Sequence, residues 1–174
     1  MTASDAEGVL ITGVYGSGKS SVAAEIAYLL EQRGEPYALL DLDYLGWADA
    51  GRAGRASEVR LMLTNLAAVA ANYRQAGIRR FVLAWFPRDA RELQGVRDAA
   101  GLPLRVVQLT VPLTDIEHRL ASDVTTGRRD DLRAAAAALA AGQGDGLADI
   151  VVRNDRPVDV VAAELMTFLR WLPG

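Results

Sequence analysis

A glycine-rich segment near the amino terminus constrains the fold of this chain more than any other feature. Residues 13–20 are Gly-Val-Tyr-Gly-Ser-Gly-Lys-Ser. They follow a short apolar run at residues 9–12, which is typical of a buried strand, and they lead into residues 19–32, where apolar side chains recur at helical spacing. Glycine permits the tight turn that joins such a strand to such a helix, and the amide N–H groups of the turn point toward one centre. The segment therefore predicts an anion site at the start of a helix.

The spacing is that of the Walker A motif, with its fixed positions at Gly13, Gly18, Lys19 and Ser20. In this motif the lysine reaches the β- and γ-phosphates of a nucleotide and the hydroxyl binds Mg²⁺. The alternative is a glycine-rich turn without a ligand, but the strand, loop and helix that the motif requires are all predicted here. The expected nucleotide contacts are Gly13, Tyr15, Gly16, Ser17, Gly18, Lys19, Ser20 and Ser21.

The rest of the chain alternates short apolar runs with longer helical patterns. Strands are predicted at residues 9–12, 37–42, 80–86, 104–111 and 150–152. Helices are predicted at residues 19–32, 57–76, 89–100, 114–122, 130–141 and 158–172. Such alternation favours parallel βαβ units with helices on both faces of one sheet. A length of 174 residues with 51% hydrophobic residues indicates one globular domain over residues 1–174.

Composition excludes several kinds of site. The chain has no cysteine and one histidine, His118, which rules out disulfides, thiol nucleophiles and zinc ribbons. A net charge of -3 argues against binding to nucleic acid or to an anionic membrane. The sequence has neither an apolar run of membrane-spanning length nor a basic amino-terminal signal. We therefore expect a cytoplasmic protein.

Two carboxylates, Asp41 and Asp43, follow the second predicted strand. In an open α/β sheet the ligand crevice lies beyond the carboxyl ends of the strands, and residues two apart on a strand point the same way. Both acids could then face the crevice, where one could hold Mg²⁺ through water and one could accept a proton from a hydroxyl. Asp43 is preferred as the acid nearer the loop. The alternative is a strand-end turn, in which aspartate is common.

These features together resemble the small P-loop kinases, a group that includes adenylylsulfate, gluconate and shikimate kinases and chloramphenicol phosphotransferase. The resemblance implies a three-layer fold with a five-stranded parallel sheet of order 2-3-1-4-5 and a helical lid over about residues 114–133. It also implies ATP and Mg²⁺ as cofactors, with Ser20 and Asp41 toward the metal and Asp43 toward the acceptor hydroxyl. Arg119, Arg128 and Arg129 of the lid would neutralise charge on the transferring phosphoryl group, unless they are solvated helix charges.

The third predicted strand departs from the family pattern, since no acid follows it. Trp85, Phe86 and Arg88 stand there, where they could form an apolar wall and grip an anionic group of the acceptor, although core packing explains the aromatics equally well. Arg60 is a further acceptor candidate that a surface position would also explain. Asn154 follows the fifth strand, where related kinases hold the adenine ring.

We expect an ATP-dependent phosphotransferase that moves the γ-phosphate to a hydroxyl of a small molecule, without nucleic-acid or membrane partners. The alternative is a nucleotide-binding regulatory protein that hydrolyses slowly or not at all, which the missing acid on the third strand supports. The residues do not name the acceptor or the oligomeric state.

Overall fold

The computed structural model describes residues 6–48, 54–121 and 126–171, without the side chains of residues 119–121, 126–129 and 131. Five strands, all parallel, form one sheet in the order β2-β3-β1-β4-β5. Their bounds are β1 (Glu7–Thr12), β2 (Tyr37–Asp41), β3 (Arg80–Ala84), β4 (Leu104–Thr110) and β5 (Ile150–Arg153). The predicted parallel sheet and its order are confirmed.

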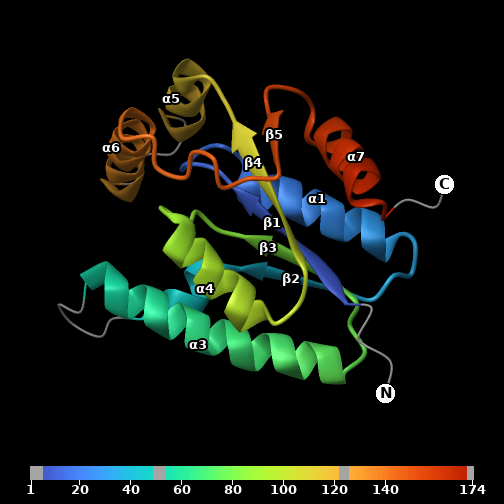
Figure 1. Ribbon diagram of the computed structural model, residues 1–174. Helices are drawn as coiled ribbons and strands as arrows, with labels where there is room; N and C mark the ends of the chain where they lie inside the picture. The colour runs from blue at the N-terminus through green and yellow to red at the C-terminus, as the bar shows by residue number, and fades with distance from the viewer. Residues whose placement is uncertain (1–5, 49–53, 122–125, 172–174) are drawn as a thin grey trace.

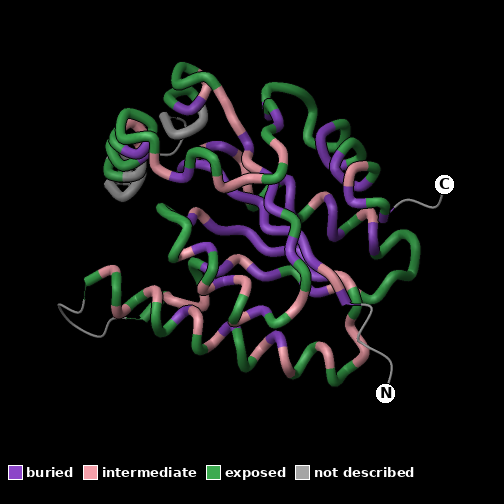
Figure 2. Tube along the Cα trace, viewed as in Figure 1, coloured by how far each residue is buried: buried purple, intermediate pink, exposed green. Residues whose placement is uncertain are grey.

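Helices cover both faces of this sheet (Figure 1). Their bounds are α1 (Lys19–Glu31), α2 (Leu42–Gly46), α3 (Gly54–Gln75), α4 (Ala90–Ala100), α5 (Leu113–Ala121), α6 (Thr126–Ala140) and α7 (Val158–Leu169). Five of the six residues of the central strand β1 are buried, which is the pattern of a strand covered on both sides. Figure 2 shows the same arrangement, with buried residues concentrated in the sheet and on the inner sides of the helices.

The alternating side chains of β1 divide the core into two halves. Val9 and Ile11 pack with α1 and α7 on one face of the sheet. Leu10 packs with α3 and α4 on the other face. Because both halves meet at β1, the loop that follows this strand leaves from the best-buried part of the molecule.

Helices α5 and α6 stand apart from these two layers, at the carboxyl-terminal end of the sheet (Figure 1). They form a small cluster of their own in which Ile116, Ala135 and Ala138 contact Val14 of the glycine-rich loop. Phe86 packs against the same cluster. The segment expected to be a lid, about residues 114–133, corresponds to α5 and the first half of α6.

Several predicted boundaries need correction. β2 ends at Asp41, and Asp43 lies in the first turn of α2 instead of on a strand. α3 begins at Gly54, so Ser57, the predicted first residue and possible cap, lies inside the helix. α6 begins at Thr126, four residues before the predicted helix start at residue 130. Both helices begin earlier than predicted because each has a glycine at or near its first residue. Glycine has a low helix propensity, so these segments were assigned to loops.

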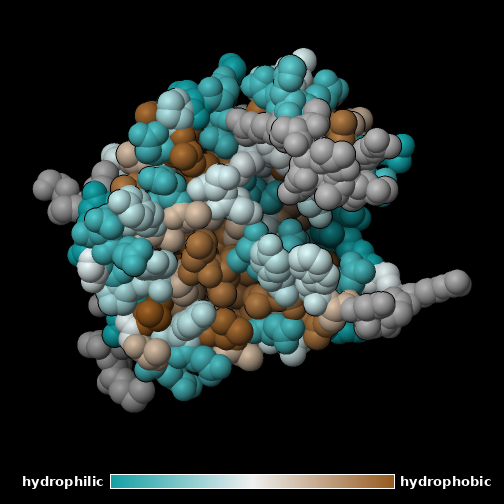
Figure 3. Space-filling model, turned by 180° about the vertical axis from the view of Figure 1, so that it is seen from behind, coloured by the Kyte–Doolittle hydropathy of each residue, from teal (hydrophilic) through white to brown (hydrophobic). Residues whose placement is uncertain are grey.

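The face of the molecule seen from behind is largely hydrophilic (Figure 3). The view from behind shows a compact group of hydrophobic side chains near the centre of that face, with hydrophilic side chains around it (Figure 3). Among the helices that the structure describes, none combines the length and the hydropathy needed to cross a bilayer.

Candidate functional site

The glycine-rich loop, residues 13–20, depends on glycines in conformations that other residues rarely adopt. Gly13, Gly16 and Gly18 have φ angles of 138°, 77° and 93°. A Cβ atom on Gly13 would also lie 2.6 Å from the Leu109 carbonyl oxygen and 2.6 Å from Ser17 Oγ. Side chains other than hydrogen are therefore excluded at Gly13 both by backbone strain and by lack of space.

The start of α1 has the features of an anion-binding site. Gly18 caps the helix in a left-handed conformation without a side-chain hydrogen bond, and the first turn contains no acid. The first N–H groups of a helix have no partner within the helix, and its dipole favours negative charge at this end. Lys19 Nζ donates to the Val14 carbonyl at 3.2 Å and lies 5.3 Å from the centre of the Tyr15 ring. A cation thus stands over the loop beside the helix terminus.

The Asn154 side chain is hydrogen-bonded to the glycine-rich loop. Its side chain is 5% exposed, and its amide donates to the Ser17 carbonyl at 2.7 Å. The Asn154 backbone N–H donates to Thr110 at the end of β4. The Ser17 hydroxyl is fully buried, without a hydrogen-bond partner among the described residues, so its side chain packs under the loop. Asn154 therefore links the end of the sheet to the loop conformation.

The paired acids reach the same groove as the loop, although not by the predicted geometry. Ser20 Oγ donates to Asp41 Oδ2 at 2.8 Å. Asp41 also caps α2, because its Oδ1 accepts from the Asp43 backbone N–H at 3.2 Å. The resulting groove of ≈ 2380 Å³, open to solvent, contains Lys19, Ser20, Asp41 and Asp43. Tyr15, Gly16, Gly18, Ser21 and Asn154 line it as well.

Asp43 is the acid with the more unusual electrostatic environment. Burial raises its pKa above the ordinary value of 3.8, and the negative charge of Asp41 adds to this effect. The positive charges of Lys19 and Arg55 and a hydrogen bond with Trp85 act in the opposite direction without cancelling it. A carboxylate with a raised pKa beside a phosphate site is suited to accepting a proton.

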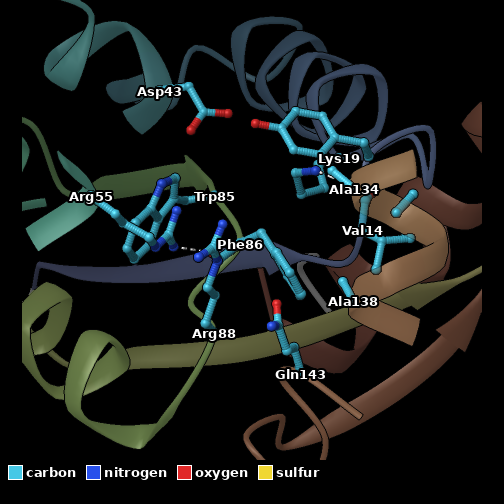
Figure 4. Close-up of a pocket in the computed structure, with 12 residues that line it drawn as sticks. Val14, Lys19, Asp43, Arg55, Trp85, Phe86, Arg88, Ala134, Ala138 and Gln143 are labelled. Atoms are coloured by element: carbon cyan, nitrogen blue, oxygen red, sulfur yellow. Dashed lines mark hydrogen bonds between the residues drawn. The ribbon is translucent and has the colours of Figure 1, made fainter. Parts of the chain in front are cut away.

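A smaller pocket, with a volume of ≈ 460 Å³ that includes space open to solvent, lies on the other side of Lys19 and Asp43 (Figure 4). Its walls come from the loop, from the segment after β3 and from α6, and Asp43 and Lys19 lie at one end of it. The remaining lining residues are Val14, Tyr15, Arg55, Trp85, Phe86, Arg88, Ala134, Ala135, Ala138 and Gln143. Trp85 and Arg88, both predicted to meet an acceptor, are therefore brought to the same pocket as Asp43.

Arg55, which lines this pocket, and its partner Glu92, which lies behind it on the surface groove between α3 and α4, were not indicated by the sequence. Arg55 Nε and Nη2 donate to the two carboxylate oxygens of Glu92 at 2.8 and 2.7 Å, and the guanidinium lies 5.5 Å from the centre of the Trp85 ring. Burial opposes ionisation of Glu92, but the hydrogen bonds from Arg55 and from the Arg88 backbone outweigh it, so the pKa of Glu92 is lowered. The two side chains form a partly buried, bidentate ion pair.

Sequence reasoning missed this pair because residues 51–57 have loop composition and Glu92 is 37 positions away in the chain. One local signal was present: Asp89 followed three residues later by Glu92 is a helix-capping pattern. Asp89 does accept from the Glu92 backbone N–H at 2.9 Å. That signal marks a helix start, and it contains no information on Arg55.

Arg60 lies outside the site. It lines a separate surface groove between α3 and α4, where its Nη2 donates to Ser57 at 3.1 Å. Because α3 begins at Gly54, Arg55 turns toward the pocket, and Arg60, five residues later, points about 140° away around the helix. His118 is exposed on α5. The side chains of Arg119, Arg128 and Arg129 lie outside the described part of the structure.

Two aromatic side chains, one on α2 and one directly after it, line the outer part of the large groove. Tyr44 and Trp47 stack with ring centres 5.5 Å apart and are 68% and 78% exposed. Their apolar surface borders the groove beside Asp43.

No family model matches the sequence, and none of the curated proteins matches it. Solved structures do. The adenylylsulfate (APS) kinase of Mycobacterium tuberculosis, in complex with AMPPNP and APS, is 26% identical with a TM-score of 0.67, over 95% of this chain and 98% of that one. The chain has the fold of the small P-loop kinases. A sugar kinase from Janibacter has a TM-score of 0.70 at 17% identity, over 95% of both chains. Shikimate kinase from Acinetobacter baumannii, in complex with shikimate, has a TM-score of 0.60 at 16% identity, over 97% of this chain and 95% of that one.

The expected membership of the small P-loop kinase group is confirmed at the level of the fold.

Proposed function

We propose that this P-loop protein is an ATP-dependent phosphotransferase that moves the γ-phosphoryl group to a hydroxyl of a small molecule. One observation carries the proposal: Lys19 and Asp43 line both the large groove of the loop and the adjoining pocket. A phosphate held at Lys19 and a hydroxyl held at Asp43 would meet where the two cavities join.

Catalysis in this arrangement is positioning and charge stabilisation. The loop N–H groups, the start of α1 and Lys19 hold the phosphates, with Gly16, Gly18 and Ser21 beside them. Asp43 accepts the proton of the acceptor hydroxyl while the oxygen of that hydroxyl attacks the γ-phosphorus. The bond from the γ-phosphorus to the bridging oxygen breaks, and ADP leaves with that electron pair. The raised pKa of Asp43 makes it a stronger base than an exposed aspartate.

Ser20 and Asp41 fit a magnesium ion. Hydroxyl and carboxylate oxygens are ligands that Mg²⁺ prefers, and here they lie 2.8 Å apart at the Walker A serine. When bound, the ion would neutralise charge on the phosphates. Asp41 would hold the ion in place of an acid at the end of β3.

The outer parts of the site complete the proposal. Asn154 lies at the base of the loop and lines the large groove on the side of β5, where we place the adenosine part of ATP. Trp85 and Arg88 form the acceptor pocket with the lid, and Arg119 and Arg128 of the lid stabilise the transferring group.

The decisive experiment compares Lys19→Ala and Asp43→Ala with Asp98→Ala, an exposed acid on α4, in an ATP-consumption screen of hydroxyl compounds. We expect both site variants to lose acceptor-dependent turnover by orders of magnitude while keeping the circular-dichroism spectrum of the wild type. Full activity in Asp43→Ala would remove the assigned base.

The second candidate is a nucleotide-binding protein that transfers nothing. The absence of an acid at the end of β3 favours it, since Trp85 follows that strand directly. In that case Mg·ATP binds, but no acceptor raises ADP release above the rate with ATP alone.

A further inference from the structure

The acceptor pocket contains an arginine whose charge is already compensated. Arg55 uses Nε and Nη2 on the Glu92 carboxylate, and Nη2 also reaches the Phe86 carbonyl at 3.3 Å. Its guanidinium lies over the Trp85 ring. The Nε–Nη2 edge of the guanidinium, one of the two edges that can match a carboxylate or a phosphate of a ligand, is therefore occupied by the protein itself.

The other charges of the pocket do not favour an anion either. Lys19 is directed toward the loop, where its ammonium contacts the Val14 carbonyl. Arg88 is exposed, so its attraction is screened by solvent, and the negative charge of Asp43 opposes it. Once Arg55 is paired with Glu92, the charged side chains that remain in the pocket are Asp43, Arg88 and Lys19, and the Lys19 ammonium is directed to the phosphate loop.

The walls between these groups are apolar. Trp85 and Phe86 contribute aromatic surface, and Val14 lies with the small side chains of Ala134 and Ala138 on the side of α6 (Figure 4). Ala135 of α6 also lines the pocket. Alanines leave space there, and apolar surfaces favour a ligand that has an apolar face.

We propose that the acceptor is an uncharged, hydroxyl-bearing molecule with an apolar face, and that Glu92 sets this preference by neutralising Arg55. The inference rests on the proposed phosphotransferase function. It separates this chain from two of its neighbours, because APS and shikimate, the compounds bound to them, are anions. Glu92 acts here as a specificity-determining residue that works through Arg55.

The test uses matched pairs of acceptors that differ in charge: hydroxy-carboxylates and their methyl esters, including shikimate and methyl shikimate. Phosphorylated products are detected by mass spectrometry, and kcat/KM is measured for both members of each pair that reacts. We expect the neutral member to be preferred, and Glu92→Gln to lower the ratio of neutral to anionic kcat/KM by at least about tenfold, because Arg55 is released toward the ligand.

Two control variants separate the effect of charge on acceptor preference from an effect on folding. The double variant Arg55→Gln/Glu92→Gln again has no net charge at this position, so its ratio should return toward that of the wild type. Glu31→Gln, at the exposed end of α1, should leave the ratio unchanged. Thermal melts of every variant establish that the comparison is made on folded protein.

Preference of the wild type for anionic members, or an unchanged ratio in folded Glu92→Gln, overturns the inference while phosphoryl transfer stands. If calorimetry shows that Mg·ATP binds and yet no member of any pair is phosphorylated, the proposed transfer is refuted and this inference falls with it.

Discussion

The hydrogen bond from Asn154 to the P-loop allows a quantitative prediction. The Asn154 amide donates to the Ser17 carbonyl at 2.7 Å, and both residues are buried. In Asn154→Ala this carbonyl loses its donor where water cannot easily replace it, which costs roughly 1–3 kcal/mol. For a domain of this size each kcal/mol lowers Tm by about 2–4 °C, so we expect Tm to fall by roughly 2–12 °C.

The chain offers a matched control in Asn65. Its side-chain amide also donates to a backbone carbonyl at 2.7 Å, that of Leu45, but in a partly buried place outside the P-loop. Asn65→Ala should lower Tm less, because water can reach the freed carbonyl. Only Asn154→Ala should also weaken Mg·ATP binding, since only that variant loosens the loop.

Melting curves by circular dichroism and titration calorimetry with Mg·ATP measure the two effects on the same samples. The reasoning fails if Asn154→Ala lowers Tm by no more than Asn65→Ala does. It fails in a different way if Tm falls as expected but the affinity for Mg·ATP is that of the wild type, because the bond would then stabilise the fold without shaping the loop.

Two further predictions concern Gly13 and Asp43. Gly13→Ala should lower the free energy of unfolding, measured by denaturant titration, by at least about 2 kcal/mol, because it adds backbone strain and two close contacts. Gly34→Ala is the control: Gly34 has a φ of 67° but nothing within 4 Å, so this variant should lose clearly less stability. Because its pKa is raised in the folded state, Asp43 binds a proton more tightly there, and its contribution to stability falls as pH rises from 3.8 through the raised pKa. Asp43→Asn should therefore raise Tm at pH 7, with the gain disappearing toward pH 3.8, while acceptor-dependent turnover is lost; a lower Tm at pH 7 would contradict the assigned burial effect.

Features that depend on neighbouring residues could be predicted from the sequence. The glycines, Lys19 and Ser20 stand within eight positions, and the strand before them and the helix after them have strong apolar patterns. The parallel sheet follows from the same alternation, although its strand order came from the resemblance. Local periodicity therefore accounts for most of the fold and for the phosphate side of the candidate site.

The acceptor side could not be predicted because its contacts join distant segments. Asp43 was expected on a strand. Asp41 caps α2, however, so a helix begins directly after β2 and Asp43 lies in its first turn. Arg55 depends on where α3 begins, and a segment rich in glycine and alanine gives no clear signal for that. Its partner Glu92 comes from another helix, so no spacing rule connects the two.

The carboxylate that bonds the Walker A serine stands at the end of β2, the strand beside β3. β2 and β3 pair in register, with Asp41 opposite Ala84, so the last residue of β2 lies one strand away from the place where the acid would stand. From there Asp41 bonds Ser20 directly, and the position after Ala84 is open to another side chain. Trp85 fills it, with a backbone N–H that donates to Ile11 of β1 and a ring that supports Arg55. With the carboxylate on β2, the end of β3 offers an apolar wall, which would suit the uncharged acceptor proposed above.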